Sequence, residues 1–232
     1  MKFGGLQKNS LIDFPGKVSC VLFLKGCNFD CPYCHNPDLL DNGPSCPCAL
    51  EEEEFFNFLE TRRGLLDGVV VSGGEPTLHD GLPLLCQKIK EMGFALKLDT
   101  NGSRPKCIQE IIDQQLVDYI AMDIKTDPNR YGQCVKADFE STKVLVSIRI
   151  IMESNIPYEF RTTCVQQIID EEKISNISKE IKGARLYALQ KYHPTKILHP
   201  EFFKQGQVGF TDESMIRFQS IASNWVEECI VR

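Results

Sequence analysis

The feature that most limits the possible folds is an alternation of short apolar segments with longer segments of helical periodicity. Six such pairs follow one another along the chain, a rhythm typical of βα units built around a parallel sheet. The predicted strands are Val18–Leu24, Gly68–Ser72, Ala95–Thr100, Tyr119–Asp123, Tyr158–Thr163 and Ala184–Leu189. The predicted helices are Glu51–Arg63, Leu82–Met92, Lys106–Gln115, Phe139–Glu153, Asp170–Ile181 and Asp212–Glu228.

This rhythm fits an open sheet as well as part of a (βα) barrel, because periodicity alone does not separate the two. In both architectures the loops after the carboxyl ends of the strands build the site. No linker, repeat or low-complexity tract divides the chain. We therefore expect one domain, with an N-terminal segment over 1–17, a core of six βα units over 18–190 and a C-terminal helical region over 191–232.

Composition narrows the classes of partner. The chain has 232 residues, of which 42% are hydrophobic and 25% charged, as in ordinary globular proteins. Its formal net charge of −6 lacks the basic excess that meets phosphates, so we expect neither a nucleic acid nor a membrane surface as partner. Met1–Gly16 lacks the apolar segment of a signal peptide, and no apolar run approaches the roughly 18 residues of a membrane span. We expect a cytoplasmic protein.

Eleven cysteines in such a chain indicate thiols and metal ligands rather than a disulfide framework. Cys27, Cys31 and Cys34 form the pattern C-x3-C-x2-C in the loop after the first predicted strand. Three thiolates on one short loop can hold three irons of a cubane and leave the fourth iron without a protein ligand, as a catalytic metal site requires. The alternatives are a zinc site completed by His35 and reduced cysteines that bind no metal.

With Tyr33 directly before the last cysteine, this spacing resembles the signature of the radical S-adenosylmethionine (SAM) superfamily. The resemblance implies a [4Fe–4S] cluster on Cys27, Cys31 and Cys34, whose open iron chelates the amino and carboxylate groups of SAM. An electron passed through the cluster then breaks a carbon–sulfur bond of SAM to give a 5′-deoxyadenosyl radical. Protein groups position SAM and tune the cluster potential, and Tyr33 is expected beside the adenine.

Residues at the ends of the following strands resemble further loops of this family. In Gly73-Gly74-Glu75-Pro76 the two glycines let the backbone approach a ligand, and carbonyls with the Glu75 carboxylate can accept hydrogen bonds from the SAM amino group. The plainer alternatives are ordinary turns, surface ion pairs and a solvated arginine. Whether a cation binds beside SAM is left open. The other expected SAM contacts are Asp99, Thr100, Asn101, Asp123, Lys125 and Arg161.

The segment before the first strand resembles one found in activases of glycyl-radical enzymes. Ser10–Gly16 is similar to their Ser-x-x-Asp-Gly-Pro-Gly segment, with Phe14 in place of a glycine. The resemblance implies that Asp13, Phe14 and Gly16 contact the glycyl loop of a partner enzyme. A plain turn before a strand is the alternative.

The resemblance covers nearly the whole chain and is closest to the activating proteins of anaerobic ribonucleoside-triphosphate reductase. It implies a partial TIM-type (βα)6 barrel that is open on one side, and a radical SAM enzyme that generates a glycyl radical on its partner. The expected partners are that reductase and an electron donor of the flavodoxin or ferredoxin type. Alternatives are an activase of pyruvate formate-lyase or another glycyl-radical enzyme, a small-molecule radical SAM enzyme such as a 7-deazaguanine-type synthase, and a non-enzymatic iron–sulfur protein for electron transfer or regulation.

The cysteines outside the motif carry no predicted role. Cys46 and Cys48 lie close in sequence to the cluster motif, but two cysteines cannot house a second cubane. Cys164 and the remaining cysteines fall in predicted strands, helices or isolated loop positions, where cysteine usually behaves as a small hydrophobic residue.

Overall fold

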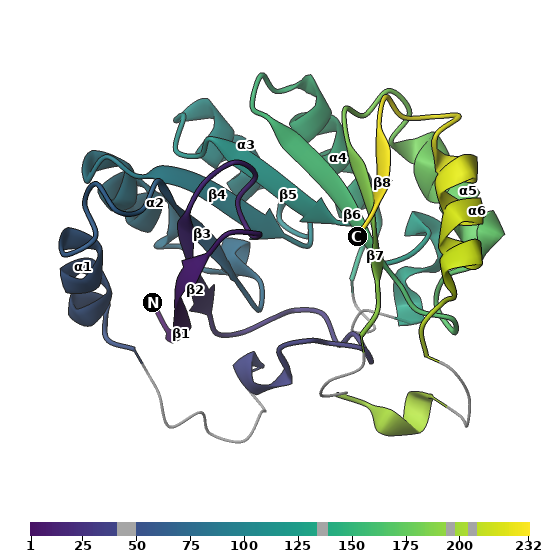
Figure 1. The fold of residues 1–232 in the computed structure, drawn as a ribbon, viewed down its shortest axis with the longest axis horizontal. Helices are drawn as coiled ribbons and strands as arrows, with labels where there is room; N and C mark the ends of the chain where they lie inside the picture. The colour runs from purple at the N-terminus through teal and green to yellow at the C-terminus, as the bar shows by residue number, and fades with distance from the viewer. Residues whose placement is uncertain (41–49, 134–138, 194–197, 204–207) are drawn as a thin grey trace.

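The computed structural model of the protein describes residues 1–40, 50–133, 139–193, 198–203 and 208–232. One eight-stranded sheet, in the order β1 to β8, runs through it (Figure 1). The antiparallel strand β1 pairs with β2, and from β2 to β8 all neighbours are parallel. The strands are β1 (Phe3–Ser10), β2 (Ser19–Leu24), β3 (Gly68–Gly73), β4 (Ala95–Thr100), β5 (Tyr119–Asp123), β6 (Tyr158–Cys164), β7 (Tyr187–Lys191) and β8 (Cys229–Val231).

A helix follows each strand from β2 to β7, and short 3₁₀ turns lie in several of the loops. The α-helices are α1 (Glu52–Glu60), α2 (Leu82–Glu91), α3 (Pro105–Asp113), α4 (Thr142–Glu153), α5 (Glu171–Glu180) and α6 (Asp212–Ala222). The 3₁₀ turns are η1 (Pro37–Leu39), η2 (Pro76–Leu78), η3 (Pro128–Gln133) and η4 (Pro200–Phe202). The predicted α/β class, with parallel strands in a single sheet, is confirmed.

Two strands were not predicted. β1 lies in the segment expected to be only a lead-in to the first strand, and its half-polar sequence Gln7-Lys8-Asn9 hides the strand pattern. β8 lies directly after the helix predicted over Asp212–Glu228, in the region expected to be helical, and α6 itself ends at Ala222. Arg232, just after β8, donates to the buried Glu159 carboxylate of β6 at 2.7 Å, so the C-terminal region contributes to the sheet as well as a helix.

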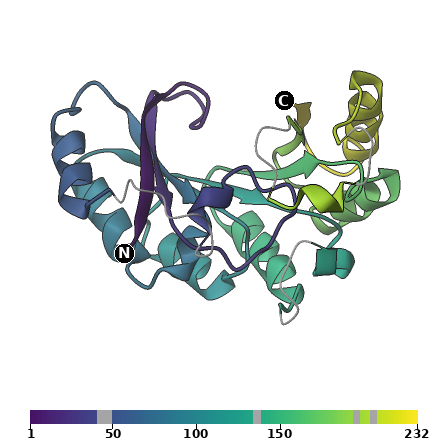
Figure 2. The same ribbon diagram turned by 90° about the horizontal axis from the view of Figure 1, so that it is seen from below.

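The two faces of the sheet are packed differently. On the outer face, Leu22 and Leu24 of β2 pack in one large core with Phe55 and Leu59 of α1, because alternate strand residues point to opposite faces. Figure 2 shows the helices along this outer side and the sheet open between β1 and β8. Helices on one face and an unclosed edge give a partial barrel.

The inner face is closed at the amino-terminal end of the barrel by Phe14. Its ring packs with Val21 and Val70, lies 6.1 Å from the Tyr119 ring and is only 2% exposed. Gly68 leaves room for it, since a Cβ there would lie 3.0 Å from the Phe14 ring. The inner space is therefore apolar around Phe14.

In the described part of the chain, every helix falls short of the length and apolar character that a membrane crossing requires.

Candidate functional site

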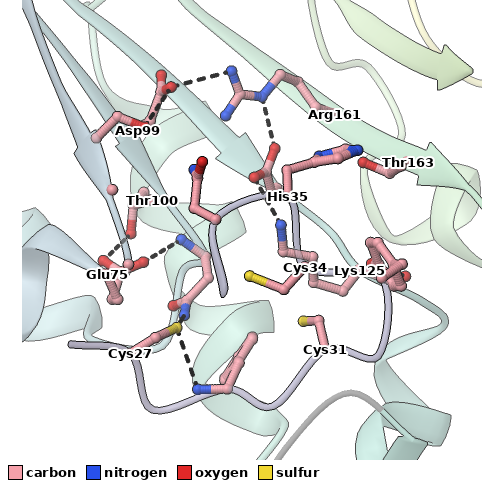
Figure 3. A pocket seen from close by; sticks show the side chains of 18 of the residues that line it. Cys27, Cys31, Cys34, His35, Glu75, Asp99, Thr100, Lys125, Arg161 and Thr163 are labelled. Carbon is pink, nitrogen blue, oxygen red and sulfur yellow. Dashed lines mark hydrogen bonds and ion pairs between the residues drawn. The ribbon is translucent and has the colours of Figure 1, made fainter. Parts of the chain in front are cut away.

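A pocket lies at the carboxyl ends of the parallel strands, where loops from β2 to β7 meet (Figure 3). Every residue predicted to bind the cluster or SAM lines this pocket except Pro76, which is buried at the start of η2. The lining residues among those predicted are Cys27, Cys31, Tyr33, Cys34, Gly73, Gly74, Glu75, Asp99, Thr100, Asn101, Asp123, Lys125 and Arg161.

The three cysteines of the motif direct their sulfur atoms into a common space (Figure 3). The Phe29 amide donates to Cys27 Sγ at 3.4 Å, and the Asn101 side-chain amide lies 3.9 Å from the same sulfur. Burial raises the pKa of the Cys27 thiol to about 12 and also raises the pKa of Cys34. Without a metal these thiols are neutral at pH 7, and a bound cation would favour the thiolates.

The zinc alternative with His35 receives no support from the geometry. Within the described segments, no three Cys, His, Asp or Glu side chains are placed to hold a single metal ion. The His35 ring instead stacks on Tyr192, with ring centroids 5.2 Å apart. Three sulfurs around one space, too dispersed for one ion, fit the separate irons of a cluster.

Two glycines bring the β3 loop against the cysteine loop. A Cβ on Gly73 would lie 2.3 Å from the Leu24 backbone, and one on Gly74 would lie 2.0 Å from the Gly26 carbonyl. The Gly74 amide donates to the Leu24 carbonyl at 2.9 Å. The two glycines were predicted to let a ligand approach the backbone closely. In the structure they let the backbone of Leu24 and Gly26 approach, and this contact fixes the start of the cysteine loop.

Glu75 is fully buried and its carboxylate is committed to the next loop. It accepts hydrogen bonds from Thr100 Oγ1 at 2.8 Å, from the Asn101 amide at 2.6 Å, and from the amide and hydroxyl of Thr77. Burial raises the pKa of Glu75, and these donors oppose the rise. Glu75 also lines the pocket, so its expected contact with the SAM amino group, together with backbone carbonyls, stays a prediction.

Asp99 and Arg161 lie on the other side of the pocket (Figure 3), and with Asp123 they form a charge network. Arg161 Nε lies 2.6 Å from Asp123 Oδ1, and Arg161 Nη1 lies 3.4 Å from Asp99 Oδ2. Lys125 Nζ is 2.8 Å from Asp123 Oδ2. Although burial raises the pKa of both carboxyls, Arg161 and the lysines more than offset it and hold the pKa of each below its ordinary value. Both carboxylates are ionised at neutral pH.

Tyr33 is a buried residue of the cysteine loop. Its side chain is 2% exposed, its hydroxyl donates to the Lys125 carbonyl at 3.4 Å, and its ring meets Tyr192 edge-on at 6.0 Å. Several lining residues were not among the predicted contacts, among them Ser72, Thr163 and Gln190. Each lies near the carboxyl end of a strand, and this position could have identified them.

The predicted partner-contact residues do not line the pocket. Asp13 accepts a hydrogen bond from Ser10 Oγ in the turn after β1, Gly16 has a φ of +70°, and Phe14 is buried as described above. The large apolar side chains exposed in this turn are Leu11 and Ile12, at 78% and 87%. Cys46 and Cys48 lie outside the described residues, and Cys164 is buried in the core.

Comparison with known proteins identifies the family to which this pocket belongs. The family model described as Radical SAM superfamily matches residues 21–176. The chain belongs to the radical SAM superfamily. A Methanocaldococcus jannaschii relative, provisionally named a glycyl-radical enzyme activating enzyme, is 37% identical over 98% of this chain and 94% of its own length. The radical SAM chain is therefore an enzyme of the activase class.

Two further relatives show the range of this similarity. The pyruvate formate-lyase-activating enzyme of Streptococcus mutans is 28% identical over 78% of this chain and 73% of its own. The crystal structure of Streptococcus suis SuiB bound to SAM superposes with a TM-score of 0.68 at 12% identity. It covers 91% of this radical SAM chain, which spans about half of SuiB, 51%. This second likeness concerns the fold alone.

Proposed function

We propose that this radical SAM activase generates a glycyl radical on an anaerobic ribonucleoside-triphosphate reductase. The observation that carries the proposal is the placement of three cysteine sulfurs and a carboxylate–arginine network around one pocket of a half-open barrel. With an electron from a donor of the flavodoxin or ferredoxin type, SAM and a glycine C–H yield methionine, 5′-deoxyadenosine and a glycyl radical.

The residues of the pocket divide the work of binding. Cys27, Cys31 and Cys34 would hold three irons, and the cluster with SAM supplies the reductive cleavage that starts the reaction. Arg161 and Lys125 present positive charge to the SAM carboxylate. The backbone carbonyls of the Gly73–Gly74 turn accept from the SAM amino group, and the aromatic group of Tyr33 and Tyr192 borders the site of the adenine.

The open side of the sheet supports a protein substrate. β1 and β8 are not paired with each other, so the barrel wall is incomplete between them (Figure 2). A segment of another chain can enter there and reach the pocket without unfolding the wall. We place the turn that contains Asp13, Phe14 and Gly16 near this entry, with the exposed Leu11 and Ile12 at its tip.

The choice of the reductase rests on the similarity of Ser10–Gly16 and of the whole chain to that group of activases. Pyruvate formate-lyase remains the alternative partner, because its activating enzymes are also relatives. The described cysteines carry no disulfide, in keeping with a reducing cytoplasm.

The test is an anaerobic assay by electron paramagnetic resonance. The cluster-loaded protein, SAM and a strong reductant are mixed with the anaerobic reductase of the same organism or, separately, with its pyruvate formate-lyase. We expect a glycyl-radical signal on the reductase only, and none when the radical-bearing glycine of the reductase is replaced by alanine. A signal on pyruvate formate-lyase alone would overturn the choice of partner. Absence of both signals, with SAM cleavage intact, would overturn both partners.

A further inference from the structure

Lys97 is a buried lysine on the inner face of the barrel. Its side chain is 2% exposed, and it stands in the middle of β4, where the register pairs it with Val70 on one side and Tyr119 on the other. Its strand neighbours Leu96 and Leu98 point to the outer core. The Lys97 stem therefore lies between the apolar floor around Phe14 and the charged layer above it, with only its ammonium directed upward.

The ammonium of Lys97 contacts Asp99, which lines the SAM pocket. Lys97 Nζ lies 2.7 Å from Asp99 Oδ1. The other oxygen, Asp99 Oδ2, accepts from Ser72 Oγ at 3.1 Å and faces Arg161 Nη1 at 3.4 Å (Figure 3). Lys97 itself is not among the residues that line the pocket. Among the described residues, its polar contact with the site is the one to Asp99.

Packing does not explain a lysine at this position. An apolar side chain would fit between Val70 and Tyr119 without the desolvation cost of a buried ammonium, and buried ion pairs are often no more stable than apolar replacements. The positive charge of Lys97 is explained by the neighbouring Asp99 carboxylate. Asp99 shares Arg161 with a second carboxylate, Asp123, which also has Lys125 as a partner, so without Lys97 the only cation in contact with Asp99 among the described residues would be this shared guanidinium.

We propose that Lys97 is a positioning residue that keeps Asp99 ionised and aimed at Arg161, and so holds Arg161 ready for SAM. The groups that face Asp99 come from four strands: Ser72 from β3, Lys97 from β4, Asp123 from β5 and Arg161 from β6. Of the two cations, only Arg161 also lines the pocket. Lys97 therefore supplies the charge that keeps Asp99 as an ionised partner of Arg161.

The first readout is the dissociation constant of SAM, measured by calorimetry on the cluster-loaded protein without any partner enzyme. For Lys97→Met we expect SAM to bind more weakly than to the parent, by a ratio that grows about tenfold per pH unit below the new pKa of Asp99. Because the dissociation constant of the variant is divided by that of the parent at the same pH, any effect of the protonation of SAM itself cancels. Lys97→Arg keeps the charge and is expected to keep the ratio flat with pH.

The second readout is the folding equilibrium of the protein without cofactors, measured by urea denaturation. The proposal requires that the loss of Lys97 in Lys97→Met raises the folded-state pKa of Asp99 above its unfolded value, so that the stability Asp99 contributes is present at low pH and lost as pH rises. We expect the variant to lose about tenfold in its folding constant, relative to the parent, for each pH unit in that window. The two readouts thus change in opposite directions with pH, which a packing defect cannot reproduce.

The matched control is the double variant Lys97→Met/Asp99→Asn, in which neither charge is present. We expect both pH dependences to disappear in it, and the effects of the two single changes on SAM binding to be strongly non-additive. A pH-independent ratio for Lys97→Met, or the same pH slope in the double variant, would overturn the proposal. If Lys97→Met does not fold, the double variant is expected to fold; failure of both would assign Lys97 to packing alone.

Discussion

Two buried carboxylates at the ends of neighbouring strands are held in opposite ways. Glu75, after β3, is surrounded by hydroxyl and amide donors from Thr77, Thr100 and Asn101. Asp99, at the end of β4, faces the cations Lys97 and Arg161. Burial raises the pKa of both, but only Asp99 has cations that reverse the shift.

The difference separates two tasks within one pocket. Neutral donors around Glu75 fix backbone, because they tie the β3 loop to the loop that carries Asn101 beside Cys27. Cations around Asp99 fix charge, because they set how Arg161 meets a ligand. The buried carboxylate of Glu75 therefore links two loops by hydrogen bonds, whereas that of Asp99 sets the electrostatic environment of Arg161.

The largest effect on stability is expected for Arg161→Met. The change leaves Asp99 and Asp123 without their shared cation, and breaking a buried pair typically costs about 3–5 kcal/mol. Because the parent pKa values of both carboxyls are depressed, the stability they contribute is present above their unfolded pKa and is lost as pH falls. Urea denaturation should show the full deficit at pH 7 and a smaller one below pH ~4.

The matched control is Arg217→Met on α6, where the arginine side chain is 67% exposed. A surface change of this kind should move the unfolding free energy by no more than about 0.5 kcal/mol. Equal losses in the two variants would contradict the assignment of Asp99 and Asp123 to an electrostatic network.

An intermediate effect is expected for Glu75→Gln. The amide turns an acceptor into a donor among groups that already donate, at a cost of about 1–3 kcal/mol. Since the folded-state pKa of Glu75 is raised, its contribution is present at low pH and lost as pH rises through that pKa. The deficit of the variant should therefore narrow from pH ~4 upward, the reverse of Arg161→Met. If the stability deficits of Glu75→Gln and Arg161→Met changed with pH in the same direction, the proposed difference between the two carboxylates would be contradicted.

The smallest effect is expected for Thr100→Val. It removes a hydroxyl that donates to Glu75 at 2.8 Å and accepts from the Gly102 amide at 3.1 Å. One hydrogen bond of this kind contributes about 1 kcal/mol. Thr61→Val, beyond the end of α1, is a control whose hydroxyl only donates to a nearby exposed carbonyl. If Thr100→Val lowers the unfolding free energy no more than Thr61→Val does, the hydrogen bond from Thr100 to Glu75 does not stabilise the contact between the two loops.

The sequence predicted the six βα units because their apolar strands and amphipathic helices repeat with clear periods. It missed β1 and β8, whose stability comes from pairing with neighbours rather than from their own pattern: β1 is half polar, and β8 has only three residues. The helix predicted to end at Glu228 ends at Ala222. The short segment Cys229–Val231 that becomes β8 reads equally well as helix or strand, so its pattern does not mark where the helix ends.

The site was predictable where chemistry follows a strand end. Cysteine spacing and the polar residues after β3 to β6 meet at one pocket because parallel strands bring their carboxyl ends together. What each group contacts was not predictable. The hydrogen bonds that tie Glu75 to the next loop and the contact of Lys97 with Asp99 follow from tertiary partners, which the sequence pattern does not show.

The most direct test of the account is anaerobic cleavage of SAM by the reconstituted protein under a strong reductant, with 5′-deoxyadenosine followed by chromatography. The parent and Cys107→Ala, which changes a cysteine outside the pocket, should both form the product, whereas Cys31→Ala should form none. Loss of product in all three, although the parent holds its cluster and binds SAM, would contradict the assignment of this pocket to radical SAM chemistry.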